Sequence, residues 1–159
     1  MKNTAHNHAL DEPYTAALRR IFEEQIVFNS VIGLKITSIT AELVSGTITM
    51  QPKLIGHFSH QRLHGGVISA GLDAMGGLAI MARLGQRHQD DSLEARTHRF
   101  NRLGTIDLRI DYLRPAVGEN FVLTAETIRL GSRVGTTQMR FIGSDDQLLA
   151  IGTGAYIVS

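Results

Sequence analysis

A lone carboxylate in an apolar segment is the first feature of the sequence that can do chemistry. Asp73 lies in the stretch from Val67 to Ala82, where its neighbours are Ala, Gly, Leu and Met and no cationic residue lies within a few positions. An unpaired buried carboxylate is costly, so Asp73 needs either a partner from elsewhere in the chain or a catalytic task. Two interpretations stand: a structural Asp that bonds backbone amides or an Arg, and a catalytic base or nucleophile.

The second feature is the tripeptide His64-Gly65-Gly66, which comes directly before the apolar segment. The first N–H groups of a helix have no partner within the helix, and glycine lets a ligand approach them closely. Such a helix start can stabilise the negative oxygen that forms when a nucleophile adds to a carbonyl group. The alternative is that the two glycines merely shape the turn into the helix.

The spacing of the two features makes a prediction about assembly. Asp73 follows His64 by nine residues, which is about two and a half turns of helix. Over that distance the carboxylate cannot serve an oxyanion bound at Gly65 of its own chain. A second chain, related by a two-fold axis, can place its helix start opposite Asp73. We therefore expect a dimer with its sites across the interface.

These segments also resemble one known family. HGGVISAGLD is similar to the helix signature of the PaaI-like hotdog thioesterases, and YLRPA at 112–116 resembles a strand of the same family. The resemblance covers the chain from residue 14 onward. It implies a hotdog fold and the hydrolysis of acyl-CoA thioesters without a cofactor or metal. It also implies a homodimer or homotetramer with sites built from two chains.

The resemblance assigns roles to both features. Gly65, the first glycine of the motif, is expected to polarise the thioester carbonyl through its amide, and His64 and Gly66 complete the motif. Asp73 matches the family carboxylate, which acts as a nucleophile or as a general base for water. Small residues along the apolar helix leave room for a medium- or long-chain acyl group.

Further substrate contacts are expected near these positions. Many family members carry an Asn or Gln upstream of the HGG; here the segment reads HFSHQRL, in which His57, His60 or Gln61 can substitute. Arg114 is expected to bind a CoA phosphate, since a guanidinium group suits phosphate geometry. His57 and His60 lack a carboxylate at a zinc-like position, so no metal site is expected.

Two other functions remain open on the sequence alone. A hotdog dehydratase or hydratase of hydroxyacyl thioesters needs an acid–base pair beside the acyl chain, to which His57 or His60 can contribute. A non-catalytic hotdog module that binds acyl-CoA is the other alternative. Turnover of acyl-CoA, or its absence despite tight binding, separates these functions from hydrolysis.

The elements that must position these residues follow from hydrophobic periodicity. Residues 1–12 are polar and are expected to form a flexible N-terminus. From Pro13 to Gly33, apolar residues recur at helical spacing and predict one amphipathic helix. Residues 34–51 are rich in Ile, Thr and Val and predict two antiparallel strands, with a turn somewhere in 41–46.

The apolar helix after the HGG has no polar face, so it must be covered on all sides. Residues 85–103 predict a long mobile or substrate-facing loop that can include a helical turn, and the remainder predicts a meander of strands. In the first strand of this meander, Ile106 and every second residue after it are expected on one face of the sheet. Thr105 and every second residue after it are expected on the other face. The order predicts a single α+β domain over 13–159, an antiparallel sheet wrapped around one long apolar helix.

Composition narrows the class of protein. The 159 residues carry a net charge of +1 and no cysteine. This charge gives no argument for nucleic acid or membrane as a partner, and the lack of cysteine excludes a thiolate nucleophile and a disulfide scaffold. The stretch from Val67 to Ala82 is shorter than a typical spanning helix, and the N-terminal residues lack an apolar signal segment. We therefore expect a cytoplasmic enzyme.

Overall fold

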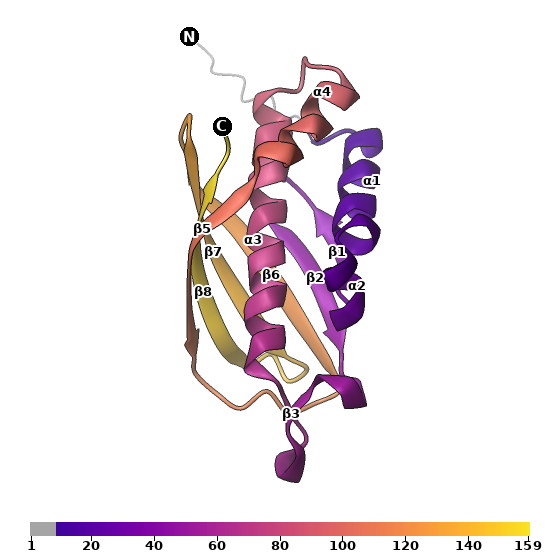
Figure 1. Cartoon of the computed structure of the whole chain (residues 1–159), viewed down its shortest axis with the longest axis vertical. Coiled ribbons are helices and arrows are strands. Elements are labelled where there is room, and N and C mark those ends of the chain that lie inside the picture. Colours follow the sequence, from indigo (N-terminus) through magenta and orange to yellow (C-terminus); the bar gives the residue numbers. More distant parts are fainter. Residues whose placement is uncertain (1–8) are drawn as a thin grey trace.

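The computed structural model describes residues 9–159, so residues 1–8 of the predicted flexible N-terminus (1–12) lie outside the described part of the chain. One long helix, α3, packs against one face of a curved sheet, and shorter helical segments lie beside it (Figure 1). The elements are, in chain order, α1 (Glu12–Arg20), the π-helix η1 (Ile21–Gln25), α2 (Val27–Ile32), β1 (Lys35–Ile39), β2 (Val44–Thr49), η2 (Pro52–Leu54), β3 (Ile55–His57), η3 (Phe58–His60), β4 (Arg62–Leu63), α3 (Gly65–Arg87), α4 (Leu93–His98), η4 (Arg99–Arg102), β5 (Gly104–Tyr112), β6 (Asn120–Leu130), β7 (Val134–Gly143) and β8 (Leu148–Ile157).

The main sheet has six strands in the order β1-β2-β6-β7-β8-β5, and every neighbouring pair is antiparallel. The arrangement confirms the predicted α+β hotdog architecture. β8 is a central strand that lies between β7 and β5, while β1 and β5 form the two edges. A small hairpin of β3 and β4 projects from the end of the molecule at which α3 begins (Figure 1).

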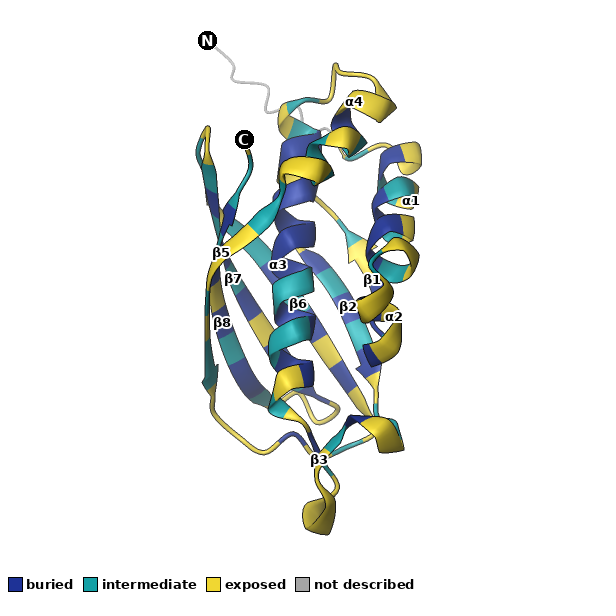
Figure 2. Cartoon of the chain, in the orientation of Figure 1, coloured by how far each residue is buried: buried dark blue, intermediate teal, exposed yellow. Residues whose placement is uncertain are grey.

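α3 forms the centre of the core. Its length and apolar composition would suffice to cross a membrane, but most of it is buried against the rest of the chain (Figure 2). Its glycines allow close packing: a Cβ at Gly76 would collide with the Tyr156 hydroxyl, and one at Gly71 would lie 2.7 Å from Leu123 Cδ2. Side chains of the sheet, among them Leu123 of β6 and Tyr156 of β8, fill the space beside these two glycines.

The N-terminal helix is broken, contrary to the prediction of one continuous helix. In η1 the backbone widens, so that the Ile26 N–H donates to the Ile21 oxygen at 2.9 Å. Ile26 then leaves the helical conformation with a ψ of 88° before α2 begins. α2 ends at Gly33, as predicted, in the left-handed conformation with a φ of 73°. Periodicity alone does not distinguish an α-helix from one that contains a π-turn.

Residues 85–103 are mostly helical, which corrects the predicted loop. The Ser92 side chain caps α4. The buried Arg96 attaches α4 to α1, because its Nη1 lies 2.6 Å from Asp11 Oδ2 and its guanidinium group lies 4.6 Å from the centre of the Tyr14 ring. These partners are distant in sequence, so the local polar pattern gave no sign of them.

Candidate active site

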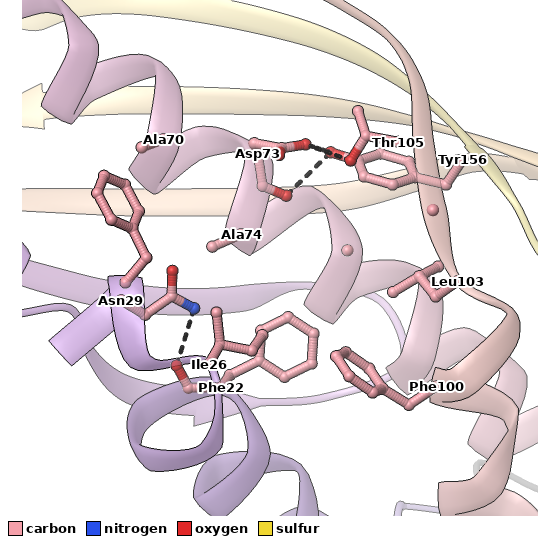
Figure 3. Close-up of a pocket in the computed structure, with 13 residues that line it drawn as sticks. Phe22, Ile26, Asn29, Ala70, Asp73, Ala74, Phe100, Leu103, Thr105 and Tyr156 are labelled. Carbon is pink, nitrogen blue, oxygen red and sulfur yellow. Dashed lines mark hydrogen bonds between the residues drawn. The ribbon is translucent and has the colours of Figure 1, made fainter.

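Asp73 lies partly buried in the middle of α3, where it faces two hydroxyl groups (Figure 3). The Thr105 hydroxyl of β5 donates to Asp73 Oδ1 at 2.8 Å. The Tyr156 hydroxyl of β8 lies 3.2 Å from the same Oδ1 and 3.0 Å from the Asp73 backbone oxygen, and its single proton serves one of them at a time. In the described part of the chain no cation lies within ion-pair distance of Asp73. Neutral donors therefore orient the carboxylate, and the Arg partner of the structural interpretation is not found.

Tyr156 is fixed as a hydrogen-bond donor. Burial raises the pKa of its phenol far above the ordinary value, and the nearby negative charge of Asp73 raises this pKa further. Both hydroxyl groups that approach the Asp73 side chain contact Oδ1, whereas Oδ2 receives no hydrogen bond from residues 9–159. Oδ2 is therefore the carboxylate oxygen that is available to a water molecule or a substrate.

A β-bulge turns Thr105 toward Asp73. Thr105 pairs with Tyr156 across β5 and β8, but the next paired residue of β5 is Asp107, so Ile106 is the extra residue. Directly opposed residues share a face of the sheet, and Thr105 therefore points inward with Tyr156. The predicted alternation, which placed Ile106 and Thr105 on opposite faces in strict sequence, is wrong at this end of the strand, and Ile106 is 58% exposed.

Sequence reasoning missed both Thr105 and Tyr156 as partners of the carboxylate. They lie 32 and 83 positions from Asp73, and no spacing rule joins them to it. The available signal was indirect: a carboxylate inside an apolar helix needs donors, and hydroxyl residues on the strands that cover the helix are candidates.

The Asp73 carboxylate opens into a pocket of about 330 Å³ between α3, the α1–α2 segment and η4. Asp73, Thr105 and Tyr156 form one polar wall. Apart from Asn29, the remaining lining is apolar or glycine: Phe22, Ile26, Phe28, Ala70, Ala74, Gly77, Phe100, Leu103 and Gly104. A partly buried stretch in the middle of α3 marks where the pocket meets the helix (Figure 2). The pocket suits an apolar chain whose reactive end lies beside Asp73.

At the start of α3, one backbone N–H group has no hydrogen-bond acceptor among residues 9–159. His64 is the N-cap, and its Nδ1 accepts a hydrogen bond from the Gly66 N–H at 2.8 Å. The Gly65 N–H donates to no acceptor among residues 9–159. The Tyr112 hydroxyl donates to the Gly65 oxygen at 3.0 Å and holds this turn against β5. Gly65, rather than Gly66, is thus the glycine with a donor available for an oxyanion.

One chain does not bring the two candidate features together. Gly65 precedes Asp73 by eight residues on the same helix, a rise of about 12 Å. Gly65 lines a shallow surface hollow with Arg62, Tyr112 and Arg114, and this hollow does not include Asp73. Gly65 and Asp73 of one chain are therefore as far apart along α3 as expected, and this separation was the reason to expect a site shared between two chains.

The other predicted contact residues lie near the start of α3. His57, His60 and Gln61 are exposed on the β3–β4 hairpin, where the two His rings lie 4.9 Å apart and Gln61 Nε2 donates to the Phe58 oxygen at 3.0 Å. The exposed Arg114 donates through Nη1 to the Leu148 oxygen at 2.9 Å. None of the four lines the Asp73 pocket of its own chain. Residues 9–159 contain no group of three or more His, Asp or Glu side chains arranged to hold a metal ion.

Replacing Thr105 by Val tests the orientation of the carboxylate. The change removes the 2.8 Å bond to Asp73 Oδ1 and leaves a side chain of similar shape. If Asp73 does the chemistry, we expect kcat to fall about 10-fold, the effect of losing one hydrogen bond to a charged group. Thr105→Ser, which keeps the hydroxyl, should stay within a few-fold of the original kcat. Equal kcat values for the Val and Ser variants would contradict an orienting role.

Comparisons with known proteins identify the family to which the chain belongs. A family model described as "Thioesterase superfamily" matches residues 60–150. The chain is 33% identical over 138 residues to the medium/long-chain acyl-CoA thioesterase YigI of Escherichia coli, with 87% of this chain and 89% of YigI covered. A crystal structure of a Shewanella oneidensis protein related to the thioesterase superfamily is 36% identical, covers 94% of this chain and 99% of that one, and superposes with a TM-score of 0.86. A Syntrophus aciditrophicus structure is 34% identical, with a TM-score of 0.80 and coverage of 91% and 95%.

The matched segment contains the HGG motif, Asp73 and Thr105, and the fold of the whole described chain agrees with that of the solved relatives. Sequence, fold and site thus support one assignment, which was already implied by the resemblance of the HGG helix. The chain belongs to the thioesterase superfamily and has its hotdog fold.

Proposed function

We propose that the protein is a cytoplasmic acyl-CoA thioesterase that hydrolyses medium- or long-chain acyl-CoA to the free acid and CoA. The observation that carries this proposal is the Asp73 carboxylate, with Oδ2 unengaged by residues 9–159, on the wall of an apolar pocket. The name of YigI, a relative that shares 33% identity, supports the same substrate class.

In the proposed reaction, Asp73 acts through Oδ2 as a general base or as the nucleophile. As a base, it takes a proton from a water molecule while the water oxygen bonds to the thioester carbon. The carbonyl oxygen becomes an oxyanion, which accepts a hydrogen bond from a Gly65 amide at a helix start. The carbon–sulfur bond then breaks, the CoA thiolate takes up the proton that Asp73 removed from water, and the carboxylic acid remains.

The Gly65 amide in this scheme belongs to the partner subunit of a homodimer. Asp73 and Gly65 of one chain are separated by about 12 Å of helix rise, so both can meet one thioester only if two chains contribute. β5 is suited to the contact, because it is a sheet edge with unpaired backbone groups and exposed apolar side chains: Ile106 is 58% and Tyr112 54% exposed. A tetramer of two such dimers is compatible with the same site.

The substrate is placed by groups at both ends of the site. The acyl chain lies in the apolar pocket, whose lining includes Phe22 and Phe100, two rings packed edge to face with centroids 5.7 Å apart. The CoA phosphates lie near the start of α3 of the other subunit, where Arg62 and Arg114 line the same hollow as Gly65. His57 and Gln61 of the β3–β4 hairpin and Gly66 in the first turn of that helix are proposed to contact the thioester or its CoA part.

A panel of acyl-CoA substrates, with the released thiol as readout, tests the proposal. We expect hydrolysis of medium- and long-chain acyl-CoA at a higher kcat/KM than acetyl-CoA, because short chains leave the pocket unfilled. Tight binding of every acyl-CoA without thiol release would instead indicate a binding module. Hydration of crotonyl-CoA without thiol release would indicate a hydratase, and either result would contradict the proposed function.

A further inference from the structure

Asn29 is a buried polar residue of the pocket wall that the proposed reaction does not use. It is 3% exposed and lines the pocket among apolar side chains of the α1–α2 segment and η4. A polar group buried in such surroundings is costly unless both ends of its amide find partners. The two ends of the Asn29 amide have different environments.

The amide nitrogen of Asn29 supplies a hydrogen bond that the backbone loses at the break in the N-terminal helix. Because the Ile26 N–H donates to Ile21 in η1, it does not reach the Phe22 oxygen, which would be its acceptor in an α-helix. Asn29 Nδ2 donates to that Phe22 oxygen at 2.9 Å. A carbonyl oxygen can only accept, so this bond determines which end of the amide carries the nitrogen.

The amide oxygen consequently points away from Phe22 and into the pocket, on the side of Ala70 and Ala74 (Figure 3). Residues 9–159 provide no hydrogen-bond donor to Asn29 Oδ1. The pocket thus presents a carboxylate on one wall and, among apolar side chains on another wall, a hydrogen-bond acceptor with no protein partner in the described chain. We therefore expect the ligand that occupies the pocket to carry a hydrogen-bond donor that reaches Asn29 Oδ1.

We propose that the preferred acyl group carries a hydroxyl on its chain and that Asn29 Oδ1 selects it. This inference rests on the proposed thioesterase function. A plain hydrocarbon chain would displace water from the pocket and leave Oδ1 unpaired, whereas a hydroxyl donates to it. An amide on the chain fits less well, since its carbonyl oxygen would also need a donor and the apolar lining supplies none. When the thioester, the hydroxyl and the remaining tail of the chain each have a fixed place, the last of them against the apolar lining, the carbon that carries the hydroxyl is also fixed in handedness.

The test compares dodecanoyl-CoA with its monohydroxylated derivatives, each position as separate enantiomers, by kcat/KM for thiol release. We expect at least one hydroxylated isomer to react about 10-fold faster than dodecanoyl-CoA, with its mirror image slower, because an unpaired buried acceptor is penalised. Asn29→Leu should abolish this preference. In its protonated form, Asn29→Asp keeps both an acceptor oxygen and a donor for the Phe22 oxygen, and in that form it should retain the preference.

The preference is a ratio of two substrates in one protein, so it does not depend on how much of a variant is folded. No faster hydroxylated isomer in the unmodified protein would overturn the inference even if neither variant folds. An Asn29→Leu protein that slows both substrates in proportion would show that Asn29 only closes the helix break. Hydrolysis of all substrates alike would contradict the hydroxyl inference alone, whereas hydrolysis of none would contradict the thioesterase function as well.

Discussion

Asp73→Asn is expected to lower kcat for acyl-CoA hydrolysis by at least about 10²-fold, since a positioned general base typically contributes ~10²–10⁴-fold. The substitution is well matched to the site. The Asn carbonyl oxygen can still accept from Thr105 and Tyr156, as Oδ1 does at 2.8 and 3.2 Å. What disappears is the negative charge and Oδ2, the oxygen to which the reaction is assigned. Steady-state kinetics with the released thiol as readout measure the loss.

Two controls separate catalysis from folding. Circular dichroism and size-exclusion chromatography should show the same fold and assembly for Asp73→Asn as for the unmodified protein. Asp90→Asn makes the same chemical change at an exposed position between α3 and α4 and should leave kcat unchanged. A correctly folded Asp73→Asn protein with near-original turnover would remove Asp73 from the mechanism.

Gly65→Pro is expected to lower kcat by about 10²–10³-fold, the usual effect of losing one oxyanion donor. Proline has no N–H, so the substitution deletes the amide that is assigned to the thioester oxygen. The backbone suits it: Gly65 is the first residue of α3, and His64 before it is extended, with φ −65° and ψ 133°. We therefore expect the variant to fold, with an unfolding midpoint close to that of the unmodified protein.

Gly65→Ala is the matched control, because it adds a side-chain carbon but keeps the N–H. A Cβ at this position would lie 3.4 Å from the Tyr112 ring, which is an ordinary contact. The Ala variant should retain kcat within a few-fold. If the Pro and Ala variants lose activity equally, the added carbon and not the missing amide is responsible, and another donor must hold the oxyanion.

Much of the fold could be predicted because its signals are local. The apolar helix begins at an HGG and the strands after it are separated by clear turn sequences, so both could be read from pattern. The π-turn before Ile26, the bulge at Ile106 and the helical character of 85–103 could not. The bulge depends on the pairing of β5 with β8, and the placement of α4 depends on the contact of Arg96 with Asp11, so both involve segments far apart in sequence. The π-turn is local, but periodicity does not distinguish it from an α-helix.

The candidate site also contains some residues that could be predicted from the sequence and others that could not. Asp73 and Gly65 stood out because a charge in an apolar helix and a glycine pair at its start are unusual in sequence. Thr105, Tyr156 and Asn29 are common residue types in unremarkable contexts, and they become notable only through strand register and a helix break. A shared site was expected from the rise of the helix alone, and it remains the part of the proposal on which the mechanism depends most.

Mixing two inactive variants tests this central point directly. Asp73→Asn and Gly65→Pro chains, unfolded and refolded together, form mixed dimers in which one site carries both defects and the other carries neither. Random pairing should leave about a quarter of all sites intact in a two-fold dimer, so the mixture should regain roughly that fraction of the original activity while each variant alone stays inactive. No recovery, with mixed dimers confirmed by native mass spectrometry, would show that each site is built from a single chain and would contradict the proposed mechanism.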